Sequence, residues 1–191
     1  SLHDALPILN NDGGQNEQSI DNSLHNLEEN TVVFDEIKNK DNKKNNDSIT
    51  IDDEMNKFIN NALEKNNEYR KVHEVPPLIL DNYLCNNAFI LAKEYLTGKN
   101  YDNEKLIYEN GGEVSMIHEL SKKELSPKEL INKWYEEEKN YNYIEPKELE
   151  CDKFTQIVWK KSEKFGIGYY CKEGNLYFYV ALYYPSGNKL G

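Results

Sequence analysis

The sequence predicts an α+β domain from residue 51 onward, preceded by a disordered tail. Three observations lead to this prediction. Apolar residues recur at helical spacing from residue 55, the pattern changes to that of strands near the C-terminus, and the first 50 residues lack a sustained apolar pattern. Helices that come first and an antiparallel pair that comes last favour a layered α+β fold over a parallel βαβ fold.

Residues 1–50 are acidic and rich in asparagine: they contain ten asparagines, and ten acidic residues outnumber four lysines. Such a segment cannot bury enough apolar surface to offset the entropy lost on ordering. We therefore expect a disordered tail over 1–50 and one domain over 51–191, with a partner-binding segment around 31–37 as the alternative. The start lacks an initiator methionine, a basic region and a long apolar run, so we expect a fragment or a mature form rather than a signal peptide.

The first expected helix follows this tail. Its inward face is formed by residues at positions i, i+3, i+4, i+7 and i+8, namely Met55, Phe58, Ile59, Ala62 and Leu63. Asp52 or Asp53 can cap its start. The prolines in Val75-Pro76-Pro77 then force an extended break.

Two further helices carry clear end signals. Asp81 is the expected N-cap of the second helix and Gly98 its end, with an inward stripe of Leu84, Ala88, Leu91, Ala92 and Tyr95. Ser126, Pro127 and Glu129 form the capping pattern of the third helix, whose apolar face is Leu130, Ile131, Trp134 and Tyr135.

The C-terminal part reads as a β-hairpin. The segments 165–171 and 176–184 are rich in aromatic and apolar residues, and Lys172-Glu173-Gly174-Asn175 lies between them. Cys85 is expected to be a buried small residue of the second helix. Spacing leaves open whether Cys151 and Cys171 form a disulfide.

The net charge of −11 over 191 residues argues against a nucleic-acid partner, because no basic field would gather phosphates. The charge argues less strongly against anionic lipid, since a local basic patch can exist on an acidic chain. No stretch approaches the roughly 20 apolar residues that a membrane-spanning helix needs.

Four segments together resemble the CAP superfamily, the SCP domain of cysteine-rich secretory and plant pathogenesis-related proteins. They are 66–70 with 75–78 (NNEYR, VPPL), 134–142 (WYEEEKNYN), 152–162 (DKFTQIVWKKS) and 183–188 (YYPSGN). The resemblance covers residues 54–191 and looks nearest to the Golgi-associated, pathogenesis-related-like branch. As in that branch, the strands lack cysteines, here with Ile167 and Ala181 at the usual positions.

The resemblance implies a three-layer α-β-α sandwich with a central antiparallel sheet. It also implies a cleft in which many members place two His and two Glu that can bind a divalent metal. The first Glu matches Glu113, with Glu109 as a competing alignment, and the second matches Glu137. The positions of the two histidines hold Lys153 and Tyr101.

This departure predicts a degenerate site with no metal and no cofactor. Lysine is a poor zinc ligand at neutral pH because its amine must first lose a proton. We expect the ammonium of Lys153 to bind Glu113 or Glu137 in place of the metal; otherwise it points into solvent. An alternative metal site would use His118 with Glu119 or Glu113.

The chain also carries 14 tyrosines, most of them after residue 134. Either helices cover both faces of the sheet, or the rings line a groove that suits a lipid or sterol, ligands that the resemblance also implies. We expect a non-catalytic binding module for a lipid or sterol. A protein partner is the alternative, and a hydrolase based on a metal, Glu113 or Glu137 is a weaker one. Most of the superfamily is secreted, whereas the nearest-looking branch is intracellular and membrane-associated, so the compartment stays open. The sequence also leaves the oligomeric state open.

Overall fold

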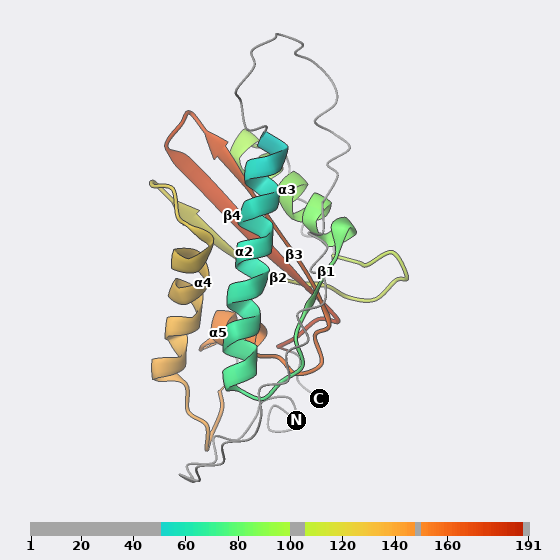
Figure 1. Ribbon diagram of the computed structural model, residues 1–191, viewed down its shortest axis with the longest axis vertical. Helices are drawn as coiled ribbons and strands as arrows, with labels where there is room; N and C mark the ends of the chain where they lie inside the picture. The colour runs from blue at the N-terminus through green and yellow to red at the C-terminus, as the bar shows by residue number, and fades with distance from the viewer. Residues whose placement is uncertain (1–50, 100–105, 148–149, 189–191) are drawn as a thin grey trace, which may run out of the picture.

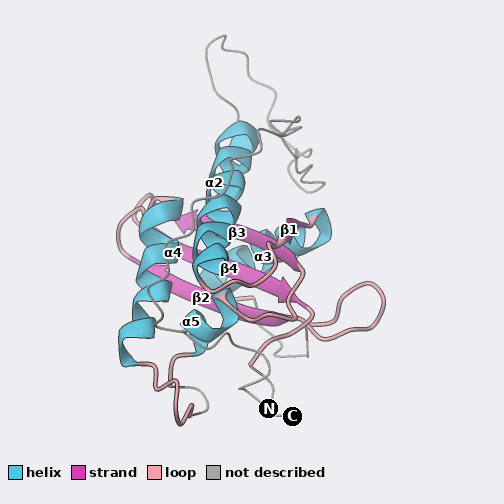
Figure 2. Ribbon diagram, turned by 60° about the horizontal axis from the view of Figure 1, so that its bottom comes forward, coloured by secondary structure: helices cyan, strands magenta, loops and turns pink. Residues whose placement is uncertain are grey.

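The computed structural model describes residues 51–99, 106–147 and 150–188, which form three layers (Figure 1). A four-stranded sheet lies between helices α2, α4 and α5 on one face and helix α3 on the other (Figure 2). The predicted α+β class and the sandwich are confirmed. The expected disordered tail over 1–50, with its alternative of a partner-binding segment around 31–37, lies outside the described residues, as does Tyr101.

Helix α2 (Ile51–Val72) buries the predicted face. Met55, Phe58, Ile59 and Ala62 are buried in the core, and Leu63 packs against it while partly exposed. The break after the helix leads into β1 (Ile79–Leu80).

Helix α3 (Asn82–Thr97) begins and ends where its signals predicted. The Asp81 carboxylate accepts the N–H of Leu84 at 2.9 Å, and Gly98 ends the helix with a φ of 69°. The inward stripe needs one correction. Tyr95 is 46% exposed while Leu96 is buried, because Tyr95 stacks on Phe178 from the rim of the helix–sheet interface.

Helix α4 (Pro127–Tyr135) starts with the predicted capping box between Ser126 and Glu129. The helix buries Leu130, Ile131 and Trp134 and leaves Tyr135 partly exposed. A 3₁₀ turn, η2 (Glu136–Asn140), follows, and the short helix α5 (Asp152–Ile157) comes after the next loop.

The sheet runs in the order β1-β3-β4-β2, with β2 at Ser115–Ser121, β3 at Lys164–Lys172 and β4 at Leu176–Tyr184. The β3–β4 pair confirms the predicted hairpin, and β2 pairs antiparallel with β4. The sheet is mixed rather than wholly antiparallel, because β1 pairs parallel with β3 through Ile79 and Leu80. Two residues are too few to carry a strand pattern in the sequence.

All three cysteines are free, so Cys151 and Cys171 do not form the disulfide that their spacing left open. Cys151 lies directly before α5, whereas Cys171 lies near the hairpin turn at the end of β3. Cys85 is fully buried on α3, as expected.

The segments that resemble the CAP domain meet one another in space. The Gly187 N–H donates to Gln156 Oε1 at 3.1 Å, and Thr155 Oγ1 donates to Asn188 Oδ1 at 2.6 Å. The guanidinium of Arg70 is fully buried and donates to four main-chain oxygens, those of Pro76, Ile157, Trp159 and Ser162. These contacts join α2 to the end of α5 and the segment that follows it, and α5 to the C-terminal turn.

Candidate functional site

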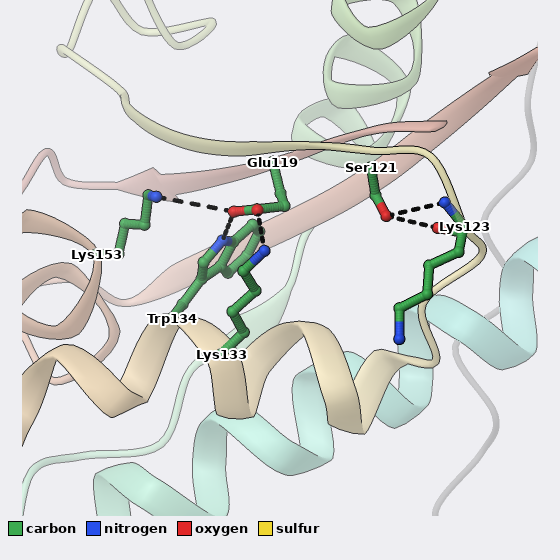
Figure 3. A network of polar contacts seen from close by, with 6 residues as sticks. All are labelled: Glu119, Ser121, Lys123, Lys133, Trp134 and Lys153. Atoms are coloured by element: carbon green, nitrogen blue, oxygen red, sulfur yellow. Dashed lines mark hydrogen bonds and ion pairs between the residues drawn. The ribbon is translucent and has the colours of Figure 1, made fainter. Parts of the chain in front are cut away.

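A carboxylate on the edge strand β2 receives donors from two helices (Figure 3). Glu119 accepts hydrogen bonds from the ammonium of Lys133 and from the indole Nε1–H of Trp134, the latter at 3.2 Å. The ammonium of Lys153 lies 3.7 Å from its Oε2 atom. Lys133 and Trp134 come from α4 and Lys153 from α5, so this one carboxylate links β2 to both helices.

Strand alternation explains why Glu119 points to this side of the sheet. It pairs with Tyr179, which belongs to the core beneath α2 and α4, whereas the preceding His118 pairs with Val180 on the α3 side. The Glu119 side chain is only 12% exposed. Burial raises the pKa of its carboxyl, but the bonds from Lys133 and Trp134 and the two ammonium charges lower that pKa more, so it lies below its usual value. The carboxylate is therefore ionised near neutral pH.

Glu137 lies beside this group on η2 and binds the backbone of α5. Its Oε2 atom accepts the N–H of Lys153 at 3.0 Å and that of Phe154 at 3.2 Å. A carboxylate at this place satisfies N–H groups that a helix start leaves without partners. Lys153 and Glu137, which were predicted to lie in one cleft, are thus neighbours.

The Lys153 ammonium was expected to bind Glu113 or Glu137. The ion pair that the structure gives it is with Glu119, which the sequence placed only in an alternative metal site. Little in the sequence indicated that Glu119 would contact Lys153, because Glu119 lies on an edge strand and its contacts with α4 and α5 form only in the folded chain.

For the other predicted residues, the structure gives the following positions. Glu113 precedes β2, forms an isolated bridge with Ile107, and accepts the N–H of Ser186 at its main-chain oxygen. The competing residue Glu109 is exposed in the turn before it. Tyr101 lies outside the described residues.

His118 does not join Glu119 in a shared metal site, because the two side chains leave β2 on opposite faces. The ring of His118 instead packs 5.4 Å from that of Phe178. Over residues 51–99, 106–147 and 150–188, no group of three or more His, Cys, Asp and Glu is placed to hold a metal ion. In the same ranges, no helix is both long enough and apolar enough to cross a membrane.

Comparisons with known proteins agree with this fold. The family described as "Cysteine-rich secretory protein family" (CAP) matches residues 63–184. The Golgi-associated plant pathogenesis-related protein 1 of Homo sapiens is 32% identical over 136 residues, which cover 69% of this chain and 84% of that protein. A probable pathogenesis-related protein of Candida albicans is 30% identical over 70% of this chain and 63% of its own length.

Solved structures show the same architecture. BmVAL-1 aligns with a TM-score of 0.54 at 19% identity, over 69% of this chain and 78% of its own. The hookworm platelet inhibitor aligns with a TM-score of 0.51 at 18% identity, over 69% and 71%. At these identities the likeness shows the fold alone. The family match over residues 63–184 and the human relative together establish that this chain belongs to the cysteine-rich secretory protein family, the CAP superfamily.

Proposed function

We propose that this chain is a non-catalytic CAP-domain binding module for a lipid or sterol, in which an ion-pair network has replaced the family's metal site. The observation that carries the proposal is the position of Lys153. It stands where the resemblance implies a histidine, and its ammonium lies beside Glu119 while its N–H binds Glu137. A protonated amine supplies positive charge where other members can hold a cation.

The chemistry of the two carboxylates favours binding over catalysis. A general base needs a pKa near the working pH and a free lone pair facing the reacting proton. The pKa of Glu119 is lowered, and that carboxylate is bound by three side chains. One oxygen of Glu137 is occupied by two backbone N–H groups. These contacts do not favour a hydrolase based on Glu137.

Tyrosine rings on the hairpin supply a surface suited to a lipid or sterol. Tyr169 and Tyr177 are partly exposed, and each packs on the buried Tyr179, with ring centroids 5.3 and 6.1 Å apart. Tyr169 also lies 4.8 Å from Phe58 of α2. Such rings combine a large apolar face with a polar hydroxyl, which suits a ligand that has an apolar body and a polar end.

The test is binding of a fluorescent sterol and a fluorescent fatty acid to the full chain. The double substitution Tyr169→Ser, Tyr177→Ser should weaken binding by about tenfold or more, in keeping with the loss of two large apolar contacts. The matched control is Tyr83→Ser, another partly exposed tyrosine on α3. Failure of the wild-type chain to bind either probe would overturn the lipid assignment and favour the protein-partner alternative. Equal loss in the control would overturn the proposed surface.

A further inference from the structure

A buried histidine lies where three helices of one layer meet. His73 follows the last residue of α2 and is 2% exposed. Its ring centroid lies 5.8 Å from that of Tyr135 on α4 and 5.5 Å from that of Phe154 on α5. The imidazole therefore fills the junction of α2, α4 and α5, away from the hairpin tyrosines.

Within the described part of the chain, one nitrogen of this ring has a hydrogen-bond partner and the other has none. Nε2 lies 2.8 Å from the hydroxyl of Tyr135, while Nδ1 is buried and has no hydrogen-bond partner among the described residues. A neutral imidazole carries one N–H donor, which on Nε2 can donate to the Tyr135 hydroxyl, so that Nδ1 leaves only a lone pair without a partner. A protonated imidazole carries two N–H donors, and the second would be buried without an acceptor, which is costly.

The charged groups around the ring do not reverse this preference. Tyr135 on α4 stays neutral, because burial raises its pKa to about 12. Arg70 on α2 directs its guanidinium to backbone oxygens, and Phe154 on α5 brings no charge. Burial lowers the pKa of His73, and the carboxylate of Glu138 on η2 opposes this only in part, so the pKa lies below its usual value.

We propose that His73 is an acid-sensitive latch: neutral, it holds α4 and α5 against the end of α2, and its protonation loosens this junction. Because the folded state disfavours the proton, the unfolded or opened state binds more protons in mildly acidic solution. The stabilisation is complete above the usual histidine pKa of about 6.5 and is lost as the pH falls towards the lower value in the folded state.

The contacts of the latch lead directly to the site on α5. Phe154, which packs on the imidazole, donates its N–H to Glu137 next to Lys153. Tyr135, the hydrogen-bond partner, stacks on Tyr69 of α2 with ring centroids 3.6 Å apart. Opening at His73 should therefore release the start of α5 and expose tyrosine rings, whether or not the chain binds lipid.

The experiment is urea unfolding of the full chain at pH 8, 7, 6 and 5, comparing wild type with His73→Phe, with His25→Gln as the control for the loss of a histidine. Between pH 7 and 5 we expect the unfolding equilibrium constant of wild type to rise several-fold more than that of His73→Phe, and the control to follow wild type. The same pH dependence in wild type and His73→Phe would overturn the latch.

A second measurement keeps the test independent of how well that variant folds. The ring protons of His73 in the wild-type chain, assigned by comparison with His73→Gln, should titrate by NMR with a midpoint below that of histidines in the urea-unfolded chain. The protection factors of the α5 amides, which compare each exchange rate with the intrinsic rate at the same pH, should fall over the same pH range. A midpoint at or above the unfolded value, or protection factors that do not change, would contradict the proposal.

Discussion

The ammonium of Lys153 on α5 lies 3.7 Å from the carboxylate of Glu119 on β2. The same carboxylate binds Lys133 and the indole of Trp134, so its negative charge is matched by donors on two helices. An edge strand is thereby fixed to the helical layer by one partly buried acid. This acid and Glu137 are the two carboxylates that organise the start of α5 and the end of α4.

Removing the acid should destabilise the fold. The substitution Glu119→Ala leaves the buried indole N–H and two ammonium groups without their acceptor, and we expect a loss of about 2–3 kcal/mol in the free energy of unfolding. Urea denaturation at pH 7 measures it. Glu136→Ala, which removes an exposed ion pair with Lys139, is the matched control and should change stability by less than about 1 kcal/mol. Equal effects of the two substitutions would contradict the role given to Glu119.

The contribution of Glu119 should also depend on pH. Its pKa is lower in the folded state, so its stabilisation is present above the usual carboxyl pKa of about 4.3 and disappears as the pH falls through the lower folded value. The difference in stability between wild type and Glu119→Ala should therefore narrow in acid, as measured by urea unfolding at pH 7 and pH 3. A difference that stays constant would mean that the charge of Glu119 contributes little.

Arg70 should be among the most sensitive positions of the chain. Arg70→Met removes four hydrogen bonds to main-chain oxygens, three of them buried, and we expect a loss of more than about 3 kcal/mol. Burial lowers the pKa of the guanidinium to about 10, so it remains charged at neutral pH. Lys71→Met, at the neighbouring exposed position, is the control and should be nearly neutral in thermal unfolding. A mild effect of Arg70→Met would show that water can replace these bonds.

Close contact between α3 and β3 predicts a steric effect at Gly166. A Cβ added there would lie 2.3 Å from the carbonyl carbon of Leu84, a backbone atom that cannot turn aside. We expect Gly166→Ala to cost about 3 kcal/mol or more in urea unfolding. Gly174→Ala tests backbone strain alone, because its φ is 74° with open space around it, and should cost about 1 kcal/mol. Similar losses at both sites would argue against the close approach.

The first 50 residues should contribute little to the stability of the domain. Deleting residues 1–50 should leave the midpoint and steepness of thermal unfolding unchanged, because their composition does not support a packed core. A lower midpoint in the deleted chain would show that a segment such as 31–37 docks on the domain.

Elements with a repeated pattern could be predicted from the sequence. The buried face of α2, the capping box at Ser126 and the β3–β4 hairpin are local signals, and the structure places them as expected. β1 could not be predicted as a strand, because it has two residues and pairs only through its neighbour β3.

The site was predictable only in part. Resemblance brought Lys153 and Glu137 together, and the structure places them in contact. Nothing local marks Glu119 as their neighbour, since an acid on an edge strand is usually solvated and its partners come from α4 and α5. The role of His73 was also missed. Its Nδ1 atom becomes buried without a hydrogen-bond partner among the described residues only when the three helices pack together, which no local pattern in the sequence indicates.

Zinc calorimetry on the full chain distinguishes a replaced metal site from an intact one, with Lys153→His, Tyr101→His as the companion variant. We expect no tight zinc binding by the wild-type chain and a gain of binding by the variant, because imidazole is a good zinc ligand and a protonated amine is not. Tight, stoichiometric binding by the wild-type chain would contradict the replacement of the metal site and reopen the case for metal-dependent chemistry.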